Sequence, residues 1–337
     1  MNQNKYSRQI LFQPIGAAGQ EKLRQAKAVI IGCGALGTTQ ANALVRAGVG
    51  SLRIVDRDYV EESNLQRQIL FDESDARENL PKAIAAQRKL KAINSDVQVE
   101  AMVADADGGN IEGLVRGFDV ILDGTDNFET RYLLNDVAVK LEIPWIYGAV
   151  VGSYATTLSV LPGRTACLAC IFPAAPKGMH ETCDTVGVIS PAVAWAAAIQ
   201  VTEAIKIMTS HEAELHNSLL SYDIWQNRQQ KIQPKMDPQC RACGARDFVH
   251  LKVGDSSHTT LCGRDAVQIR HQESRGLDMA ALKSRLEKFG AVRGNEYLLK
   301  CALDPYELTI FADGRAIIHG TQDPAVARSV YAKYVGA

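Results

Sequence analysis

Short apolar segments that alternate with amphipathic ones constrain the fold more than any other feature of this sequence. Residues 27–32 are an apolar run that ends in glycine, typical of a buried strand, and residues 36–47 have the pattern of an amphipathic helix. A charged helix is expected over 82–93. Further strands are expected at 52–56, 97–103, 118–123 and from 144 onward. Strands that alternate with helices predict an α/β fold with a doubly wound, mostly parallel sheet.

The pattern changes near Phe248, and the 337 residues are enough for two domains of about 150 residues each. Beyond this point the sequence predicts a helix, three strands and a last helix, at 279–289, 297–303, 306–311, 316–319 and from Pro324. We therefore divide the chain into a main domain, residues 1–247, and a small α+β appendage, residues 248–337. The appendage has no spacing typical of a catalytic site, which favours a docking or oligomerisation role.

Composition excludes several classes of protein. Hydrophobic residues make up 46% of the chain, and 37 basic residues balance 38 acidic ones, which argues against a nucleic-acid partner. The first residues are polar and do not form a signal peptide. The longest apolar stretch, 190–208, contains Gln200, Glu203 and Lys206, which argues against a membrane span. We expect a cytoplasmic protein with no membrane or nucleic-acid partner.

A glycine-rich turn follows the first predicted strand. Its glycines, Gly32, Gly34 and Gly37, have the G-x-G-x-x-G spacing that brings a phosphate close to the N-terminus of a helix. Asp56, at the end of the second strand, can accept hydrogen bonds from a ribose hydroxyl. These features predict a nucleotide site, and by themselves they favour an NAD-dependent enzyme. The alternative is a purely structural tight turn.

Two cations shift this balance toward a triphosphate. Arg67 lies in the segment Ser63–Gln68, and Lys82 follows fifteen residues later. A site that cleaves a triphosphate needs positive charge over the β- and γ-phosphates, whereas hydride transfer needs an acid or base beside the nicotinamide. The alternative is that both residues are ordinary solvated surface cations.

Asp126 follows the strand predicted over 118–123, at the strand end where ligands gather in open α/β sheets. Its carboxylate suits Mg²⁺, which prefers oxygen ligands and bridges phosphates. Equally, Asp126 could cap the helix that begins near Phe128.

Taken together and in order, these motifs are specific. They comprise Tyr6–Gln9, the glycine turn, Ser63–Gln68, Lys82, Asp123–Asn127 and two Cys-x-x-Cys pairs. From Tyr6 to about Phe248 the chain resembles the MoeB/ThiF adenylyltransferases, prokaryotic relatives of ubiquitin-activating enzymes. The resemblance implies a Rossmann-like sheet, a homodimer and, in residues 1–247, an ATP-binding adenylyltransferase domain. It further implies ATP-dependent adenylation of the C-terminal glycine of a ubiquitin-like sulfur carrier protein of the ThiS or MoaD type. This reaction releases pyrophosphate and prepares the carrier for sulfur transfer in thiamin or molybdopterin biosynthesis.

The resemblance also implies roles for individual residues. Asp56 would bind the ribose of ATP, Asp126 would hold Mg²⁺, and Arg8 would reach the nucleotide of the partner subunit. The residues that would surround the phosphates are Asn64, Arg67, Gln68 and Lys82. Ala35 stands where many relatives have a second consecutive glycine.

Cysteines provide a second set of candidate ligands. Two Cys-x-x-Cys pairs, 69 residues apart, suit a tetrahedral structural Zn²⁺ site formed by Cys167, Cys170, Cys240 and Cys243. Two separate redox pairs are the alternative. The resemblance aligns Cys183 with a cysteine that some relatives use to capture the activated carrier, although it could be an ordinary loop thiol.

Two other functions stay open from the sequence alone. One is an NAD-dependent oxidoreductase, and the other is a non-catalytic, zinc-stabilised module that binds ubiquitin-like proteins.

Overall fold

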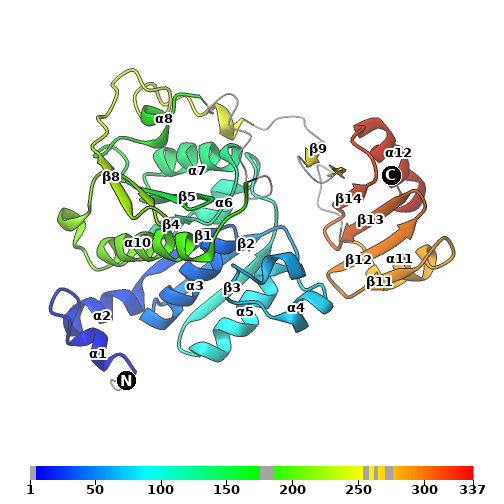
Figure 1. The fold of residues 1–337 in the computed structure, drawn as a ribbon, viewed down its shortest axis with the longest axis horizontal. Coiled ribbons are helices and arrows are strands. Elements are labelled where there is room, and N and C mark those ends of the chain that lie inside the picture. The colour runs from blue at the N-terminus through cyan, green and yellow to red at the C-terminus, as the bar shows by residue number, and fades with distance from the viewer. Residues whose placement is uncertain (1–4, 175–185, 253–257, 262–264, 270–275, 337) are drawn as a thin grey trace. The chain divides into compact units, whose positions relative to one another are not determined.

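A computed structural model describes residues 5–174, 186–252, 258–261, 265–269 and 276–336. The chain forms two compact units, the first from residues 1–73 and 81–253 and the second from residues 74–80 and 254–337. Each unit has its own sheet (Figure 1).

The first unit is built on an eight-stranded sheet with the order β3-β2-β1-β4-β5-β6-β7-β8. Strands β3, β2, β1, β4 and β5 run parallel, and β6, β7 and β8 continue the sheet antiparallel. The strands are β1 (Lys27–Ile31), β2 (Ser51–Asp56), β3 (Gln98–Val103), β4 (Val120–Asp123), β5 (Trp145–Val151), β6 (Tyr154–Val160), β7 (Leu219–Asp223) and β8 (Arg228–Ile232). The first five strands have the order of a Rossmann sheet, so the predicted fold class is confirmed.

Helices cover both faces of this sheet. Helices α3 (Ala35–Ala47), α5 (Lys82–Ile93) and α10 (Ser190–Met208) lie on one face, and α6 (Ile111–Val115) and α7 (Phe128–Leu141) lie on the other (Figure 1). Both faces of the central strands β1 and β4 are buried, so these strands are apolar at residues 28–31 and 120–122. The other helices of this unit are α1 (Ser7–Ile10), α2 (Gly16–Gln25), α8 (Leu168–Ile171) and the 3₁₀ turns η1 (Glu62–Asn64), η2 (Glu212–Glu214) and η3 (Val249–Leu251).

The second unit is α+β. Its sheet is antiparallel, with the order β11-β12-β13-β14-β10-β9. The strands are β9 (His258–Leu261), β10 (Ala266–Ile269), β11 (Val292–Gly294), β12 (Leu298–Leu303), β13 (Tyr306–Phe311) and β14 (Ala316–His319). Helices α11 (Met279–Leu286) and α12 (Pro324–Tyr334) begin where Asp278 and Asp323 accept hydrogen bonds from backbone amides of the first turn.

A short helix, α4 (Glu73–Arg77), crosses the boundary between the units in sequence, because residues 74–80 belong to the second one. Within that unit, Asn295 Nδ2 donates a hydrogen bond to the Glu78 carbonyl at 2.8 Å. The predicted boundary between residues 247 and 248 did not anticipate this segment.

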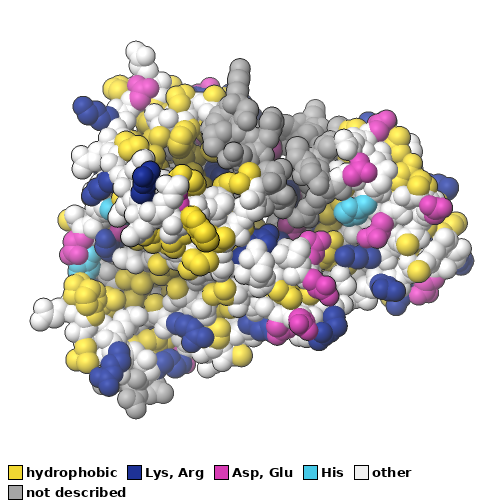
Figure 2. All heavy atoms as spheres, in the orientation of Figure 1, with side chains coloured by type: hydrophobic (Ala, Val, Ile, Leu, Met, Phe, Trp, Pro, Cys, Tyr) yellow, Lys and Arg dark blue, Asp and Glu magenta, His cyan; other side chains and the backbone are white. Residues whose placement is uncertain are grey.

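Charge on the surface is mixed. On the face that Figure 2 shows, basic and acidic side chains are interspersed, as a net charge of −1 leads one to expect. Within the described ranges, no helix combines the length and the apolar character that crossing a membrane requires.

Candidate active site and four-cysteine centre

The turn between β1 and α3 packs directly on the end of β4. Gly32 has φ +93°, and a side-chain carbon there would stand 2.6 Å from backbone atoms of Gly124. A side-chain carbon at Gly37 would stand 1.9 Å from the Gly32 carbonyl oxygen. Only glycine allows this approach, which places the N-terminus of α3 at the point where the strand order reverses between β1 and β4. Amides at such a helix N-terminus favour an anion.

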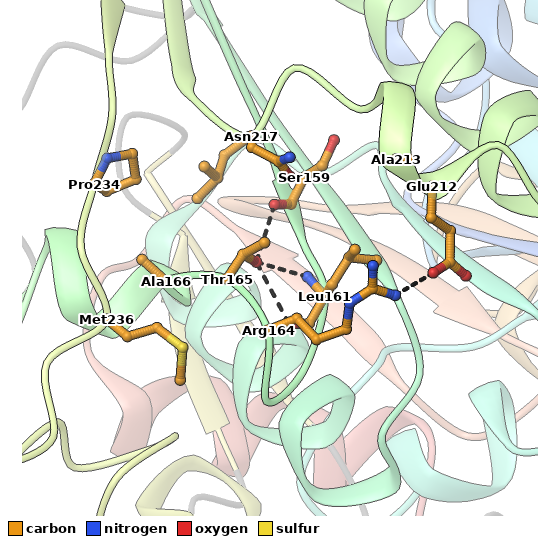
Figure 3. A pocket seen from close by; sticks show the side chains of 11 residues that line it. Ser159, Leu161, Arg164, Thr165, Ala166, Glu212, Ala213, Asn217, Pro234 and Met236 are labelled. Carbon is orange, nitrogen blue, oxygen red and sulfur yellow. Dashed lines mark hydrogen bonds and ion pairs between the residues drawn. The ribbon is translucent and has the colours of Figure 1, made fainter.

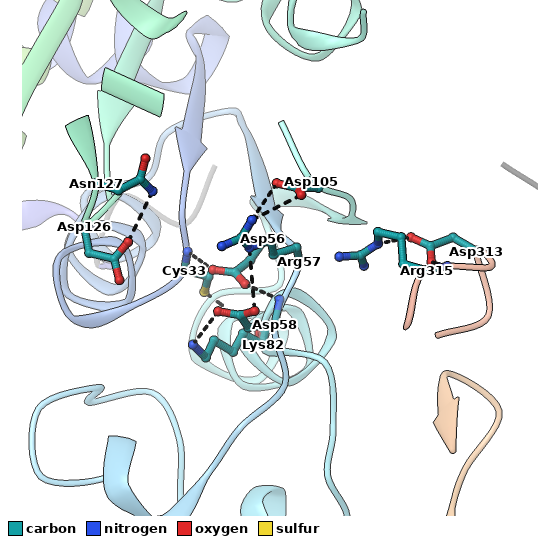
Figure 4. Close-up of polar contacts among 10 residues, drawn as sticks. All are labelled: Cys33, Asp56, Arg57, Asp58, Lys82, Asp105, Asp126, Asn127, Asp313 and Arg315. Carbon is teal, nitrogen blue, oxygen red and sulfur yellow. Dashed lines mark hydrogen bonds and ion pairs between the residues drawn. The ribbon is translucent and has the colours of Figure 1, made fainter. Parts of the chain in front are cut away.

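Asp56 stands beside this turn (Figure 4). Its two carboxylate oxygens accept hydrogen bonds from the Cys33 amide at 2.5 Å and from the Asp58 amide at 2.7 Å. Burial raises the pKa of Asp56, while the nearby charge of Lys82 opposes the shift. Each oxygen keeps a second lone pair for a further donor such as a ribose hydroxyl.

Lys82 is the first residue of α5, and it is not a solvated surface cation. Its side chain is 9% exposed, and Nζ lies 3.5 Å from Asp58 Oδ2 (Figure 4). Its amide donates to the Asp58 carbonyl at 2.8 Å, which fixes the start of α5 to the loop after β2. The sequence did not predict a role for Asp58, because this residue lies outside the motifs described above. The structure therefore brings Lys82 and Asp56 to one edge of the sheet.

The segment that contains Arg67 also reaches the glycine turn. Asn64 and Gln68 are buried, and Gln68 Nε2 would lie 4.0 Å from a side-chain carbon at Gly34. Gln68 Oε1 is buried without a hydrogen-bond partner among the described residues. Arg67 is half-buried, with Nη1 donating to the Ser63 carbonyl at 2.9 Å.

Asp126 is exposed at the end of β4, and it does not cap α7. That cap is Asn127, whose Oδ1 accepts a hydrogen bond from the Thr130 amide at 2.9 Å. Within the described residues, the one side-chain contact of Asp126 Oδ1 is a long hydrogen bond of 3.4 Å that it accepts from Asn127 Nδ2 (Figure 4). Its carboxylate can therefore take a hard cation such as Mg²⁺.

Arg8 is the predicted residue that the structure does not bring to this edge. On either side of it, Tyr6 packs on Gly48 and Gln9 Nε2 donates to the Ala47 carbonyl at 2.9 Å, so α1 lies at the C-terminal end of α3. The glycine turn lies at the other end of this 13-residue helix, about 20 Å away. Cys183 lies outside the described residues.

The four cysteines of the two pairs form one cluster. Sγ–Sγ distances are 3.8 Å for Cys167–Cys170, 3.6 Å for Cys167–Cys240 and 3.3 Å for Cys170–Cys243, and all four sulfurs lie within 4.8 Å of one another. Tetrahedral zinc with Zn–S bonds of about 2.3 Å requires sulfurs about 3.8 Å apart. Burial and the neighbouring sulfurs raise the pKa of Cys167 to about 12, so thiolates at this spacing need a cation. The four cysteines therefore form one cluster that could hold a metal, and not two separate pairs.

Helix α7 anchors this cluster. Asp136 is buried and forms a two-pronged ion pair with Arg241, with both N–O distances 2.9 Å. Asn135 Oδ1 accepts from the Leu168 amide at 2.8 Å, and the Tyr132 hydroxyl donates to the Phe172 carbonyl at 2.8 Å. Both cysteine-bearing segments are therefore bonded to the same helix.

A separate cavity of about 340 Å³ opens at the other edge of the sheet (Figure 3). It lies beyond the end of β6, where Val160 pairs with Trp145 at the amino end of β5. Ser159 in its wall donates to Glu203 Oε2 at 3.1 Å, and Arg164 forms an ion pair with Glu212. None of the predicted nucleotide-site residues lines it.

Comparisons with known proteins agree with this architecture. A sequence model of the ThiF family matches residues 6–242. The "Sulfur carrier protein ThiS adenylyltransferase" of Bacillus subtilis (strain 168) is 50% identical over 337 residues, which cover 98% of this chain and 99% of that protein. The "SAMP-activating enzyme E1" of Haloferax volcanii is 37% identical over 242 residues, or 72% of this chain and 88% of that one. Among solved structures, E. coli MccB with ATP is 26% identical with a TM-score of 0.64, covering 72% of this chain and 75% of that one.

The family match spans well over half of the chain, and it begins and ends close to the limits that the motifs indicated. The chain therefore belongs to the ThiF family, which confirms the resemblance seen in its motifs.

Proposed function

We propose that this protein is an adenylyltransferase that uses Mg²⁺ and ATP to activate the C-terminal glycine of a ubiquitin-like sulfur carrier protein. The observation that carries the proposal is the convergence of Asp56, Gln68 and Lys82 on the glycine turn, with the exposed Asp126 at the neighbouring strand end. A carrier of the ThiS type is favoured over the MoaD type, because the relative named for ThiS matches the whole chain.

The reaction needs charge compensation more than it needs a base. A C-terminal carboxyl has a pKa of about 3.5 and is already ionised at neutral pH. Its oxygen forms a bond to the α-phosphorus of ATP, the bond from that phosphorus to the bridging oxygen breaks, and pyrophosphate leaves with the electron pair. The products are the carrier acyl-adenylate and pyrophosphate.

Side chains of this unit would lower the repulsion between the two anions. Arg67 and Lys82 would neutralise the triphosphate and the departing pyrophosphate, with Asn64 and Gln68 donating hydrogen bonds. Asp126 would hold Mg²⁺, which supplies further positive charge at the phosphates when bound. Asp56 would accept the ribose hydroxyls.

We further propose a cytoplasmic homodimer in which Arg8 serves the nucleotide site of the second copy. The position of Arg8 at the far end of α3 from its own glycine turn supports this assignment. Zn²⁺ is the proposed occupant of the four-cysteine cluster, where four sulfur ligands leave no position open for chemistry. For Cys183 the proposed role is covalent capture of the carrier, and carrier adducts that persist in Cys183→Ser would remove it from the reaction.

Intact-mass spectrometry tests the main proposal. The full chain is incubated with Mg²⁺, ATP and a ThiS-type carrier, and we expect the carrier to gain a mass that matches AMP. A carrier without its terminal glycines should gain nothing. Pyrophosphate release that is independent of the tail, or the absence of any release, would contradict the proposal. Thermal stabilisation by NAD and not by ATP would point to an oxidoreductase instead.

A further inference from the structure

Asp126 stands between two residues that are held in place. The residue that follows it, Asn127, caps α7. In the residue that precedes it, Thr125, both the amide and the hydroxyl donate to Asp123 Oδ1, at 2.9 Å and 2.7 Å. The Thr125 carbonyl accepts from Arg131 Nη2 at 3.0 Å. The exposed carboxylate of Asp126 is therefore carried on a loop in which both neighbouring residues are held by hydrogen bonds.

Arg131 and Asp123 form a buried ion pair behind this loop. Arg131 is 6% exposed and Asp123 is fully buried, and Arg131 Nε lies 3.5 Å from Asp123 Oδ2. The guanidinium lies over the rings of Phe128 and Tyr147, 5.4 Å and 5.5 Å from their centroids. Burial raises the pKa of Asp123, and the charge of Arg131 opposes this shift. Arg131 thus opposes the effect of burial on the carboxylate that accepts both hydrogen bonds from Thr125.

The main chain of Asp123 is fixed as well. Gln40 from α3 and Gln200 from α10 both donate to its carbonyl, at 2.8 Å and 2.9 Å. Gln40 also donates to Gln200 Oε1 at 2.6 Å, so the two amides bind one another as well as β4. Since a desolvated ion pair adds little net stability compared with apolar residues of the same volume, stability alone is a weak reason for this pair.

We propose that Arg131 and Asp123 are positioning residues, which set the orientation in which Asp126 presents its oxygens to the Mg²⁺ that accompanies ATP. This inference rests on the proposed function, because it takes Asp126 as the Mg²⁺ ligand. Sequence analysis missed Arg131, although its spacing of four residues after Asn127 places it on the first turn of α7.

The decisive variant is Arg131→Gln, compared with Arg131→Lys and Thr125→Val. Outer-sphere changes of this kind weaken metal affinity by about 10- to 100-fold. In Arg131→Gln we expect the Mg²⁺ concentration at half-maximal ATP–pyrophosphate exchange to rise about tenfold or more. The apparent KM for ATP at saturating Mg²⁺ should stay within about twofold. Lys keeps the charge without the planar fork, so it should restore part of the Mg²⁺ affinity.

Arg241→Gln is the matched control. It breaks the ion pair with buried Asp136 on the same helix, two turns beyond the start of α7. We expect it to lower the melting temperature without moving the Mg²⁺ dependence. If Arg131→Gln loses stability but keeps the wild-type Mg²⁺ curve, the pair is structural and the inference is wrong. Where Arg131→Gln does not fold, the same comparison with Thr125→Val decides.

Calorimetry of ATP binding with and without Mg²⁺ separates this inference from the proposed function. The measurement needs no carrier, so a wild-type chain that binds Mg²⁺ and ATP but adenylates no carrier would overturn the function alone. A wild-type gain in ATP affinity from Mg²⁺ that Arg131→Gln retains in full would overturn the positioning role alone.

Discussion

The four-cysteine centre and the nucleotide site differ in how complete they are. In the first, all four sulfurs already lie within 4.8 Å of one another, and α7 holds both segments that supply them. In the second, Lys82 is 3.5 Å from its Asp58 partner, Gln68 Oε1 has no partner among described residues, and Asp126 faces solvent. A closed set of ligands suits an ion that stays with the folded chain, and an open set suits a ligand that enters and leaves.

Loss of a ligand from the four-cysteine centre should have the largest effect. Cys240→Ser removes one of four ligands, and structural Zn²⁺ contributes about 10 kcal/mol or more to the folding of small zinc domains. We expect metal content to fall from about one ion per chain to near zero, with a melting temperature lower by about 10 °C or more. Elemental analysis and calorimetry measure both. Cys301→Ala removes a buried thiol of the second unit and should keep the metal. Full metal content in Cys240→Ser would show that the four cysteines are not a closed set of metal ligands.

Substitutions in the nucleotide site should abolish activity and leave the fold intact. Asp126→Ala or Arg67→Ala should reduce carrier-dependent ATP–pyrophosphate exchange by about 100- to 1,000-fold, since one preorganised charge is lost in each. Neither side chain is fully buried, so the melting temperature should move by no more than about 2 °C. Exchange at the wild-type rate in both variants would refute the assignment.

The ion pair beside the cysteines should matter for stability alone. Arg241→Gln leaves Asp136 buried without its partner, which should lower the free energy of unfolding by about 3 kcal/mol. Urea denaturation measures this value. The double variant Arg241→Gln with Asp136→Asn carries no buried charge and should recover part of the loss. If the double variant were as unstable as the sum of both single changes, charge burial would not be the cause.

Acid should weaken the first unit slightly through His216, which belongs to neither site. Burial lowers the pKa of His216, against the opposing effect of the Glu203 carboxylate. The unfolded chain, with a histidine pKa near 6.5, then binds more protons than the folded one, so stability falls as the pH drops through about 6.5. His216→Asn should flatten this loss between pH 7.5 and about 5.5, measured by denaturant midpoints at constant metal content. An unchanged slope would show that acid acts elsewhere, for example on the thiolates.

Local pattern was enough to predict the parallel half of the sheet. The helix expected over 82–93 is α5 itself, and the strand expected over 52–56 begins one residue earlier. Buried parallel strands are apolar throughout and bounded by turns, so their signal does not depend on distant partners. The antiparallel strands β6, β7 and β8 were not predicted. Strand β8, for example, is exposed at every residue, so no apolar pattern marks it, and it forms because it pairs with β7.

The sequence predicted site residues where chemical type and spacing were enough, and it failed where a role depends on contacts made only in the folded chain. Their chemical types and spacing identified Asp56, Lys82 and the cysteines, but spacing could not decide whether Asp126 caps α7 or is available to Mg²⁺. That choice depends on which side chain faces the helix amides, and only the folded loop fixes it. Arg131 was missed because its role comes from a buried partner, Asp123, which looks like an ordinary motif residue in the sequence.

The backbone-to-backbone contact of Gly32 with Gly124 limits how nucleotide preference can be changed in the laboratory. The atoms that an added side chain would strike belong to the main chain, so no compensating substitution elsewhere makes room for it. A library that randomises Gly32, Gly37 or Gly124 would yield almost entirely dead clones. Diversity is better directed to Asp58, whose side chain lies 3.5 Å from Lys82 Nζ and has no role in the proposed reaction.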